Sequence, residues 1–196
     1  MWDWSNQSLQ KKAPDHTSLA SVYDDINLNR QSHTPVPTSY HPNPLQDPSF
    51  SFEQMHDYIE KMLQKYNLTE MSLIACDYTP QTWEEMYNIY GDYQRARTAF
   101  LKLIAYANLK DLIRLGLDEE DITQLKGGIT PENFNTHLKI PFDFGGDMSF
   151  NNFAFIRTHH THSNIHRILD MQIAGGFLMR YKKIYIPYFE GKFYYD

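Results

Sequence analysis

The sequence predicts an α+β fold, with a mainly helical N-terminal part followed by a β-rich C-terminal third. Between residues 50 and 126, apolar residues recur with the spacing of amphipathic helices and charged residues lie between them. After Gly128 the pattern changes to short segments rich in β-branched and aromatic residues, separated by turn residues. A length of 196 residues suits one domain with an appendage, or one loose domain.

Residues 1–49 are predicted to form a flexible, proline-rich leader. They hold six of the ten prolines, notably in "HTPVPTSYHPNPLQDP", and show no sustained apolar period. The alternative is a docking segment that folds on a partner or on the domain. The N-terminus has no apolar h-region, so we expect no signal peptide of the usual kind. No run approaches about 18 apolar residues, so we expect no transmembrane helix.

Residues 50–126 are predicted to be a helical scaffold. "SFEQMHDYIEKMLQKYN" indicates a helix with Ser51 as its N-cap. Residues 79–116 indicate two or three further helices, separated at Gly91 and Gly116. "DEEDITQLKGG" indicates a short helix that begins at an acidic turn and ends at its two glycines. No chemistry is visible on these helices, so we interpret their apolar stripes as core.

Residues 127–196 are predicted to contain two strands, a helix and a C-terminal β-hairpin. "HLKIPF" and "NFAFIRT" have the composition of strands and are joined by "DFGGDMSFN", a segment with turn glycines. "HHTHSNIHRILDMQIAGGFL" is helical in pattern up to its glycines. The closing "KKIYIPYFEGKFYYD" indicates two strands around Glu190 and Gly191.

Charge and cysteine content limit the classes of function. The net charge of −6 argues against a general nucleic-acid binder. The charge is uneven, because residues 1–126 hold 11 Lys and Arg against 18 Asp and Glu, whereas residues 127–196 hold 7 against 6. Phosphate can therefore approach the C-terminal third more easily than the rest. The single cysteine, Cys76, excludes an internal disulfide and a four-cysteine zinc site.

Five of the nine histidines lie between residues 137 and 166. His162 and His166 are four residues apart on the predicted helix, so both imidazoles lie on one face and can share a metal ion. A third ligand must come from elsewhere, and His137 on the first strand is the obvious candidate because a ββα unit folds that strand against the helix. Three histidines with an open fourth position are typical of a catalytic metal site.

The stretch "THLKIPFDFGGDMSFNNFAFI", followed by "HSNIHRIL", resembles the HNH motif. This motif is the ββα-metal finger of the HNH and endonuclease VII superfamily. The stretch is most similar to nuclease toxins at the C-termini of bacterial polymorphic toxins, including the Rhs type and the colicin DNases. "GGITPENFNTHLKIPFDFGG" follows the approach to the motif found in these toxins. The resemblance covers residues 127–172.

The resemblance implies roles for individual residues. The metal ligands of one divalent ion (Zn, Mg, Mn or Ni) would be His137, His162 and His166. The central asparagine, whose side-chain amide fixes the loop of the finger, would be Asn152, or Asn151 if the spacing differs by one residue. The candidates for contacts to phosphate are Lys139, Arg157 and Arg167. Asp170 is a candidate for orienting a ligand imidazole from one turn away.

One position departs from the family pattern. The residue after the first motif histidine is usually a second histidine that acts as general base, and here it is Leu138. Three assignments of the general base are open, and in the first His137 is itself the base. The metal would then be held by the two helix histidines and a carboxylate such as Glu132 or Asp143.

In the second assignment, Glu132, His159 or His160 accepts the proton from the attacking water. In the third, the general base is lost, by nature or by mutation, and the finger binds metal but cleaves feebly.

The function implied by the resemblance is a metal-dependent nuclease, with double-stranded DNA as the expected substrate, that acts as an antibacterial toxin or effector. It would be made in the bacterial cytoplasm, delivered by a secretion system into the target-cell cytoplasm, and restrained by a cognate immunity protein; no membrane partner is expected. A degenerate finger that binds nucleic acid or protein is the alternative. A phage or mobile-element endonuclease is a third candidate.

Overall fold

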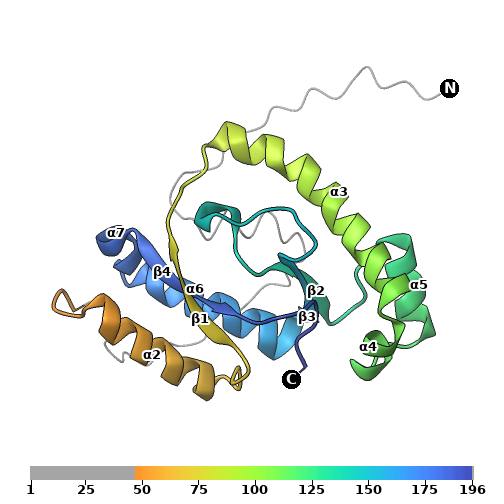
Figure 1. Ribbon diagram of the computed structural model, residues 1–196, viewed down its shortest axis with the longest axis horizontal. Helices are drawn as coiled ribbons and strands as arrows, with labels where there is room; N and C mark the ends of the chain where they lie inside the picture. Colours follow the sequence, from red (N-terminus) through yellow and green to blue (C-terminus); the bar gives the residue numbers. More distant parts are fainter. Residues whose placement is uncertain (1–46, 196) are drawn as a thin grey trace. The chain divides into compact units, whose positions relative to one another are not determined.

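The computed structural model describes residues 47–195 (Figure 1). All of these residues belong to one compact unit of the chain. The predicted leader, residues 1–49, therefore lies almost entirely outside the described residues. Within 47–195, no helix combines the length and the apolar character needed to cross a membrane.

The described residues form a mixed arrangement of helices and strands, which confirms the predicted α+β class. The helices are α2 (Phe52–Lys65), α3 (Trp83–Ala107), α4 (Leu109–Arg114), α5 (Glu119–Gly127), α6 (Ser163–Ala174) and α7 (Phe177–Tyr181). The strands are β1 (Ser72–Asp77), β2 (Phe134–Leu138), β3 (Phe153–Arg157) and β4 (Lys183–Tyr188). Two short helical turns, η2 (Phe142–Phe144) and η3 (Thr158–His162), flank β3 in sequence.

Several predicted helix boundaries are confirmed. The hydroxyl of Ser51 accepts a hydrogen bond from the backbone N–H of Gln54, whose side chain accepts one from the Ser51 N–H, so α2 begins with a capping box. α5 begins after Asp118 and ends at Gly128, which has φ of 81°. The predicted break at Gly91 is wrong, because α3, which is 25 residues long, runs through this glycine without interruption. One glycine costs a helix only about 1 kcal/mol, which the packing of α3 offsets.

The predicted C-terminal β-hairpin is also wrong. β4 pairs antiparallel with β1, with Tyr188 opposite Ser72, and the segment after Gly191 contributes only a parallel bridge from Phe193 to Phe155. Burial explains why β4 pairs with β1 and not with the segment after Gly191. Four successive residues of β4 are buried, whereas the closing segment is mostly half-exposed. β1 satisfies the backbone hydrogen bonds of β4 along one edge, and α2, α6 and α7 contact β4 and help to bury it.

β2 and β3 form a second antiparallel sheet whose two faces meet different helices. Residues directly opposite each other in an antiparallel pair lie on the same face, and successive residues alternate between faces. One face carries the pairs Phe134–Arg157, Thr136–Phe155 and Leu138–Phe153, and the other carries Asn135–Ile156 and His137–Ala154. α3 covers the first face, where the ring of Phe100 stacks on Phe153 with centroids 5.3 Å apart. Figure 1 shows α3 running alongside this hairpin.

α6 is held against the β1–β4 sheet by a buried glutamine. Gln172 is fully buried; its Nε2 donates to the carbonyl oxygen of Tyr185 and its Oε1 accepts from the Tyr185 N–H, both at 2.8 Å. The side chain therefore satisfies the backbone of β4 as a neighbouring strand would. These hydrogen bonds fix the position of α6, and of the residues at its start, relative to the β1–β4 sheet.

Candidate metal centre

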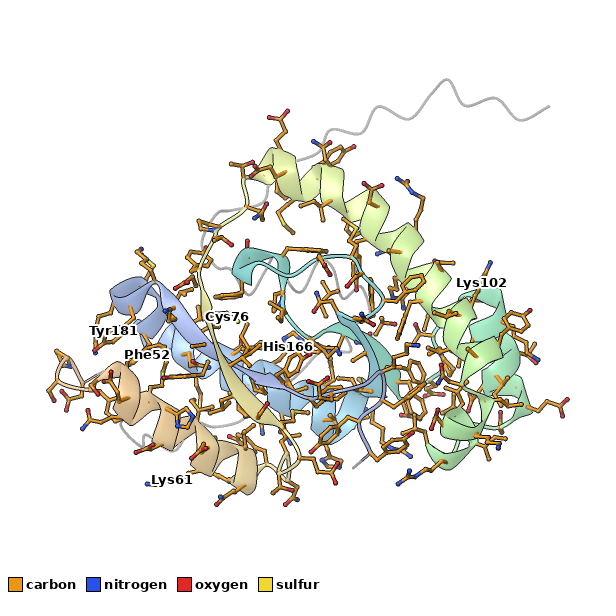
Figure 2. All side chains as sticks on the ribbon, viewed as in Figure 1. Phe52, Lys61, Cys76, Lys102, His166 and Tyr181 are labelled. Atoms are coloured by element: carbon orange, nitrogen blue, oxygen red, sulfur yellow. The ribbon has the colours of Figure 1, made fainter. Side chains whose placement is uncertain are left out.

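Three histidine side chains converge between the β2–β3 hairpin and the start of α6. His137 lies in β2, His162 is the last residue of η3, and His166 lies in the first turn of α6, where Figure 2 labels it. The ring centroids are 5.4 Å apart for His137 and His162, 5.6 Å for His137 and His166, and 4.4 Å for His162 and His166. One potential ligand nitrogen from each ring lies within 4.8 Å of the other two.

The local backbone explains how these rings meet. His137 stands opposite Ala154, a small residue that leaves space for the imidazole on the face turned away from α3. The η3 turn then reverses the chain, with His160 at φ 71° and ψ −73°, so that His162 returns toward the hairpin. The Oγ of Ser163 donates to the carbonyl oxygen of Thr158 at 2.9 Å and closes this turn.

Burial keeps two of the imidazoles neutral. Burial, with the neighbouring histidines adding to it, holds the pKa of His137 well below 6.5. Burial and the charge of His166 lower the pKa of His162 to about 3. A neutral imidazole offers a lone pair to a metal ion, so these two rings are in the binding form at neutral pH. The Nε2 atoms of His162 and His166 are 3.1 Å apart.

The donor set fits a divalent ion that prefers nitrogen ligands. Two nitrogens that lie about 2.0–2.1 Å from one tetrahedral zinc ion are roughly 3.3 Å from each other. The observed 3.1 Å between His162 and His166 is close to this value. Zinc or nickel suits three imidazoles, whereas magnesium takes oxygen ligands.

The side chain of Asn152 ties together the loop between β2 and β3. Its Oδ1 accepts from the N–H of Ile140 at 2.9 Å, and its Nδ2 donates to the carbonyl oxygens of Ile140 and Asp147, both at 2.8 Å. Asn151, the other residue that the spacing allowed, is exposed. Gly146 lies inside this loop, where a Cβ atom would stand 1.8 Å from the Ile140 carbonyl oxygen.

Two of the predicted phosphate contacts, Lys139 and Arg157, bind backbone carbonyl oxygens of the protein instead. Lys139 is only 4% exposed, and its Nζ donates to the carbonyl oxygen of Gly191 at 3.0 Å. This burial lowers the pKa of Lys139. Arg157 lies on the α3 face of the hairpin and donates to the Leu115 carbonyl oxygen at 2.6 Å. Of the three predicted phosphate contacts, only Arg167 is exposed.

Glu132 and Asp143, the carboxylates considered as metal ligands, are not part of the histidine cluster. Glu132 is exposed in the turn before β2. Asp143 is buried, and its Oδ1 accepts from the N–H of Gln81 at 3.0 Å, which ties η2 to the start of α3. Within 47–195, the ligand group that includes His137 contains histidines alone. His159 and His160 are exposed in η3, and Asp170 is exposed one turn after His166.

Sequence reasoning missed a contact between α2 and α6. The guanidinium of Arg167 lies over the ring of Tyr66, with Cζ 5.4 Å from its centre. The two residues are about a hundred positions apart, and no pattern in either segment signals the contact. Such a contact follows only from the packing of two helices on one sheet.

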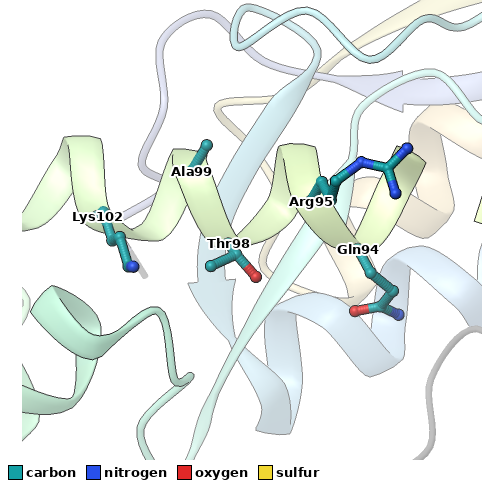
Figure 3. A pocket seen from close by; sticks show the side chains of 5 residues that line it. All are labelled: Gln94, Arg95, Thr98, Ala99 and Lys102. Carbon is teal, nitrogen blue, oxygen red and sulfur yellow. The ribbon is translucent and has the colours of Figure 1, made fainter. Parts of the chain in front are cut away.

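A shallow pocket lies along α3, away from the histidine cluster. Its lining residues all belong to this helix and are Gln94, Arg95, Thr98, Ala99 and Lys102 (Figure 3). α3 covers the hairpin face opposite His137, so these residues do not contribute to the metal centre. Arg95 is paired with Asp92.

No protein-family model, no curated protein and no solved structure matches this chain. The chemistry of the site is accordingly inferred from its own residues.

The metal-free protein is expected to lose stability as the pH falls from 7 to 5. An unfolded chain protonates His162 near pH 6.5 but the folded chain does so only near pH 3, so the unfolded state binds more protons between these values. His162 alone would cost about 2 kcal/mol at pH 5, with His137 adding to it. Thermal unfolding of the protein in chelator, repeated between pH 7 and 5, measures this loss of stability. If the stability of a His162→Gln variant depended on pH as steeply as that of the parent, the role of His162 would be contradicted.

Two neighbouring glycines provide a matched test of the loop. Gly146→Ala is expected to lower the melting temperature by roughly 10 °C or more, because the new methyl overlaps the Ile140 backbone. Gly145→Ala has open space around it and only the strain of φ 83°, about 1–2 kcal/mol, so its loss should be a few degrees. Equal losses in thermal unfolding would show that the Ile140–Asn152 contact does not constrain the loop.

Proposed function

We propose that this chain is a metal-dependent nuclease of the HNH type that cleaves phosphodiester bonds, with DNA as the expected substrate. The observation that carries the proposal is the convergence of His137, His162 and His166 from a hairpin and the helix after it. A surface cluster of histidines rarely excludes water, whereas His137 and His162 are 6% and 8% exposed. Buried, neutral and mutually close imidazoles are what a metal site requires.

The proposed ββα-metal finger consists of β2, the loop after it, β3, and η3 with α6. His137, Asn152, His162 and His166 follow one another along these elements in the order that the HNH resemblance assigns them. The three hydrogen bonds of the Asn152 amide support the loop-fixing role. Together these features favour a finger over a chance cluster.

The residues of the site divide the chemistry between them. A divalent ion held by the three imidazoles would stabilise the negative charge that builds up on the scissile phosphate. His166 is half-buried while the other two rings are buried, so substrate would approach from the His166 side. Arg167, the next residue, is exposed and would contact the nucleic-acid backbone there.

We assign the general base to η3. Leu138 pairs with Phe153 and lies on the α3 face, so this position cannot supply a base beside His137. The exposed imidazoles of His159 and His160 remain as proton acceptors. His160 has φ 71° and ψ −73°, a costly conformation for a residue with a side chain, and such conformations concentrate at functional sites.

The biological role that we propose is an antibacterial effector with a cognate immunity protein, delivered by a secretion system. The HNH resemblance of residues 127–172 is its support. A second candidate is a degenerate finger that keeps metal for structure and binds nucleic acid or protein. One observation favours it, namely that Leu138 stands where a general base is usual and lies on the α3 face.

Supercoiled plasmid nicking tests the nuclease. The full chain is expected to nick plasmid with added zinc, nickel or manganese and to stop in chelator. His137→Ala and His166→Ala should each lower the rate at least a hundredfold, because each removes a ligand. His56→Ala, which removes a histidine from α2 outside the cluster, should keep the parent rate.

Metal binding is measured on the same samples by equilibrium titration. Parent protein that binds one ion through the cluster but nicks nothing would favour the degenerate finger. Parent protein that binds no ion and nicks nothing would exclude both.

The double variant His159→Ala/His160→Ala tests the assigned base. We expect it to bind metal as the parent does but to nick plasmid about 10²–10⁴-fold more slowly, the range for loss of general base catalysis. A flatter pH–rate profile should accompany the loss. An unchanged rate would assign the proton to another acceptor and remove η3 from the chemistry.

A further inference from the structure

We propose that the C-terminal end of α2 and the start of α6 form a phosphate-binding site for the nucleic-acid backbone. The site consists of Arg167 and Lys65 beside the ring of Tyr66, and we call it the Tyr66 clamp. It extends the substrate surface to a helix outside the HNH-like segment. The inference rests on the proposed nuclease function, and its test separates the two.

The Tyr66 clamp brings two cations to one aromatic ring. The guanidinium carbon of Arg167 lies 5.4 Å from the ring centre of Tyr66, and the Nζ of Lys65 lies 5.7 Å from it. Asn164 joins the two helices, because its Nδ2 donates to the Tyr66 carbonyl oxygen at 3.4 Å and its Oδ1 accepts from Arg167 at 3.3 Å. Arg167 directly follows His166 along α6, so the two side chains leave neighbouring positions of one helix.

The geometry prepares Arg167 to bind an anion. A guanidinium that lies over an aromatic ring loses less side-chain entropy on binding, and its planar set of donors matches two phosphate oxygens. One N–H group is used by Asn164, and a guanidinium has five such donors. The side chain is exposed, so the remaining donors are accessible to a ligand.

Neither cation of the clamp is neutralised within the described part of the chain. Among residues 47–195, no carboxylate pairs with Lys65 or Arg167. Two other surface cations do pair with carboxylates, Arg95 with Asp92 and Lys183 with Asp77. Two positive charges without a carboxylate partner, one of them on the helix that carries His166, have a natural ligand in the phosphates of a nucleic-acid backbone.

The chain also provides matched controls for cation and ring chemistry. Arg114 is exposed and lies over the ring of Tyr195 at 4.3 Å, and Lys126 lies over the ring of Tyr106 at 5.9 Å. These pairs belong to α3, α4, α5 and the C-terminal segment rather than to α6. Removing them changes the net charge by the same amount as removing the clamp cations.

The test is binding of a fluorescein-labelled DNA duplex to the full chain, measured by anisotropy over a range of salt concentrations. Titrations with zinc and in EDTA are compared, since EDTA prevents metal-dependent cleavage. The double variant Lys65→Ala/Arg167→Ala should bind the duplex roughly tenfold more weakly. The slope of its log binding constant against log salt concentration should also be shallower, by the amount expected for the loss of about two phosphate contacts. Arg114→Ala/Lys126→Ala should keep the parent slope. Tyr66→Leu, which keeps both charges, should weaken binding with little change in slope.

Each outcome separates the clamp from the nuclease. If the parent binds and nicks DNA but the clamp variant matches the control variant, the clamp is overturned and the nuclease stands. If the parent binds DNA through the clamp without nicking plasmid, the clamp stands and the nuclease falls. If the parent does not bind the duplex at all, both are overturned.

Discussion

The hydrogen bonds of the Asn152 amide are the interaction on which the candidate site most depends. β2 and β3 are separated by 14 residues, and closing so long a loop costs conformational entropy. The amide ties Ile140 to Asp147 and so brings the ends of both strands together. It also protects the register, since a shift of one residue would turn His137 toward α3 and away from α6.

The second constraint is the burial of the imidazoles between the hairpin and α6. Burial favours the neutral rings that bind metal, but it makes the metal-free cluster costly whenever the histidines are protonated. A bound ion would therefore stabilise the folded state as well as supply chemistry, because the unfolded chain does not present the three ligands together. α6 contributes to this second constraint, since Gln172 anchors one part of it to β4 and His166 lies near its start.

Local signals in the sequence were sufficient for part of this account. The capping residue Ser51 and the glycine that ends α5 act within a few residues, and both were predicted. The spacing of His162 and His166, with a strand histidine before a turn, was enough to predict which three residues converge. Contacts between distant segments left no such signal. The pairing of β4 with β1 depends on how deeply β4 is buried, which its composition alone does not reveal.

The positions of the basic residues were hard to predict for a related reason. Whether Arg157 faces the histidines or α3 is decided by strand register, and a change of one residue reverses it. Lys139 is covered by the C-terminal segment, which returns from 52 residues away to accept its hydrogen bond. Both side chains were expected to contact phosphate because they are positively charged. Charge alone does not reveal which side of a strand a residue lies on or what covers it.

X-ray absorption at the zinc edge is the measurement that tests the central claim most directly. The full chain loaded with one equivalent of zinc is predicted to show three imidazole nitrogens at about 2.0–2.1 Å. The His166→Ala variant should then show only two. A zinc shell made of oxygen alone, or one unchanged by His166→Ala, would contradict the assignment of the metal centre to these three histidines.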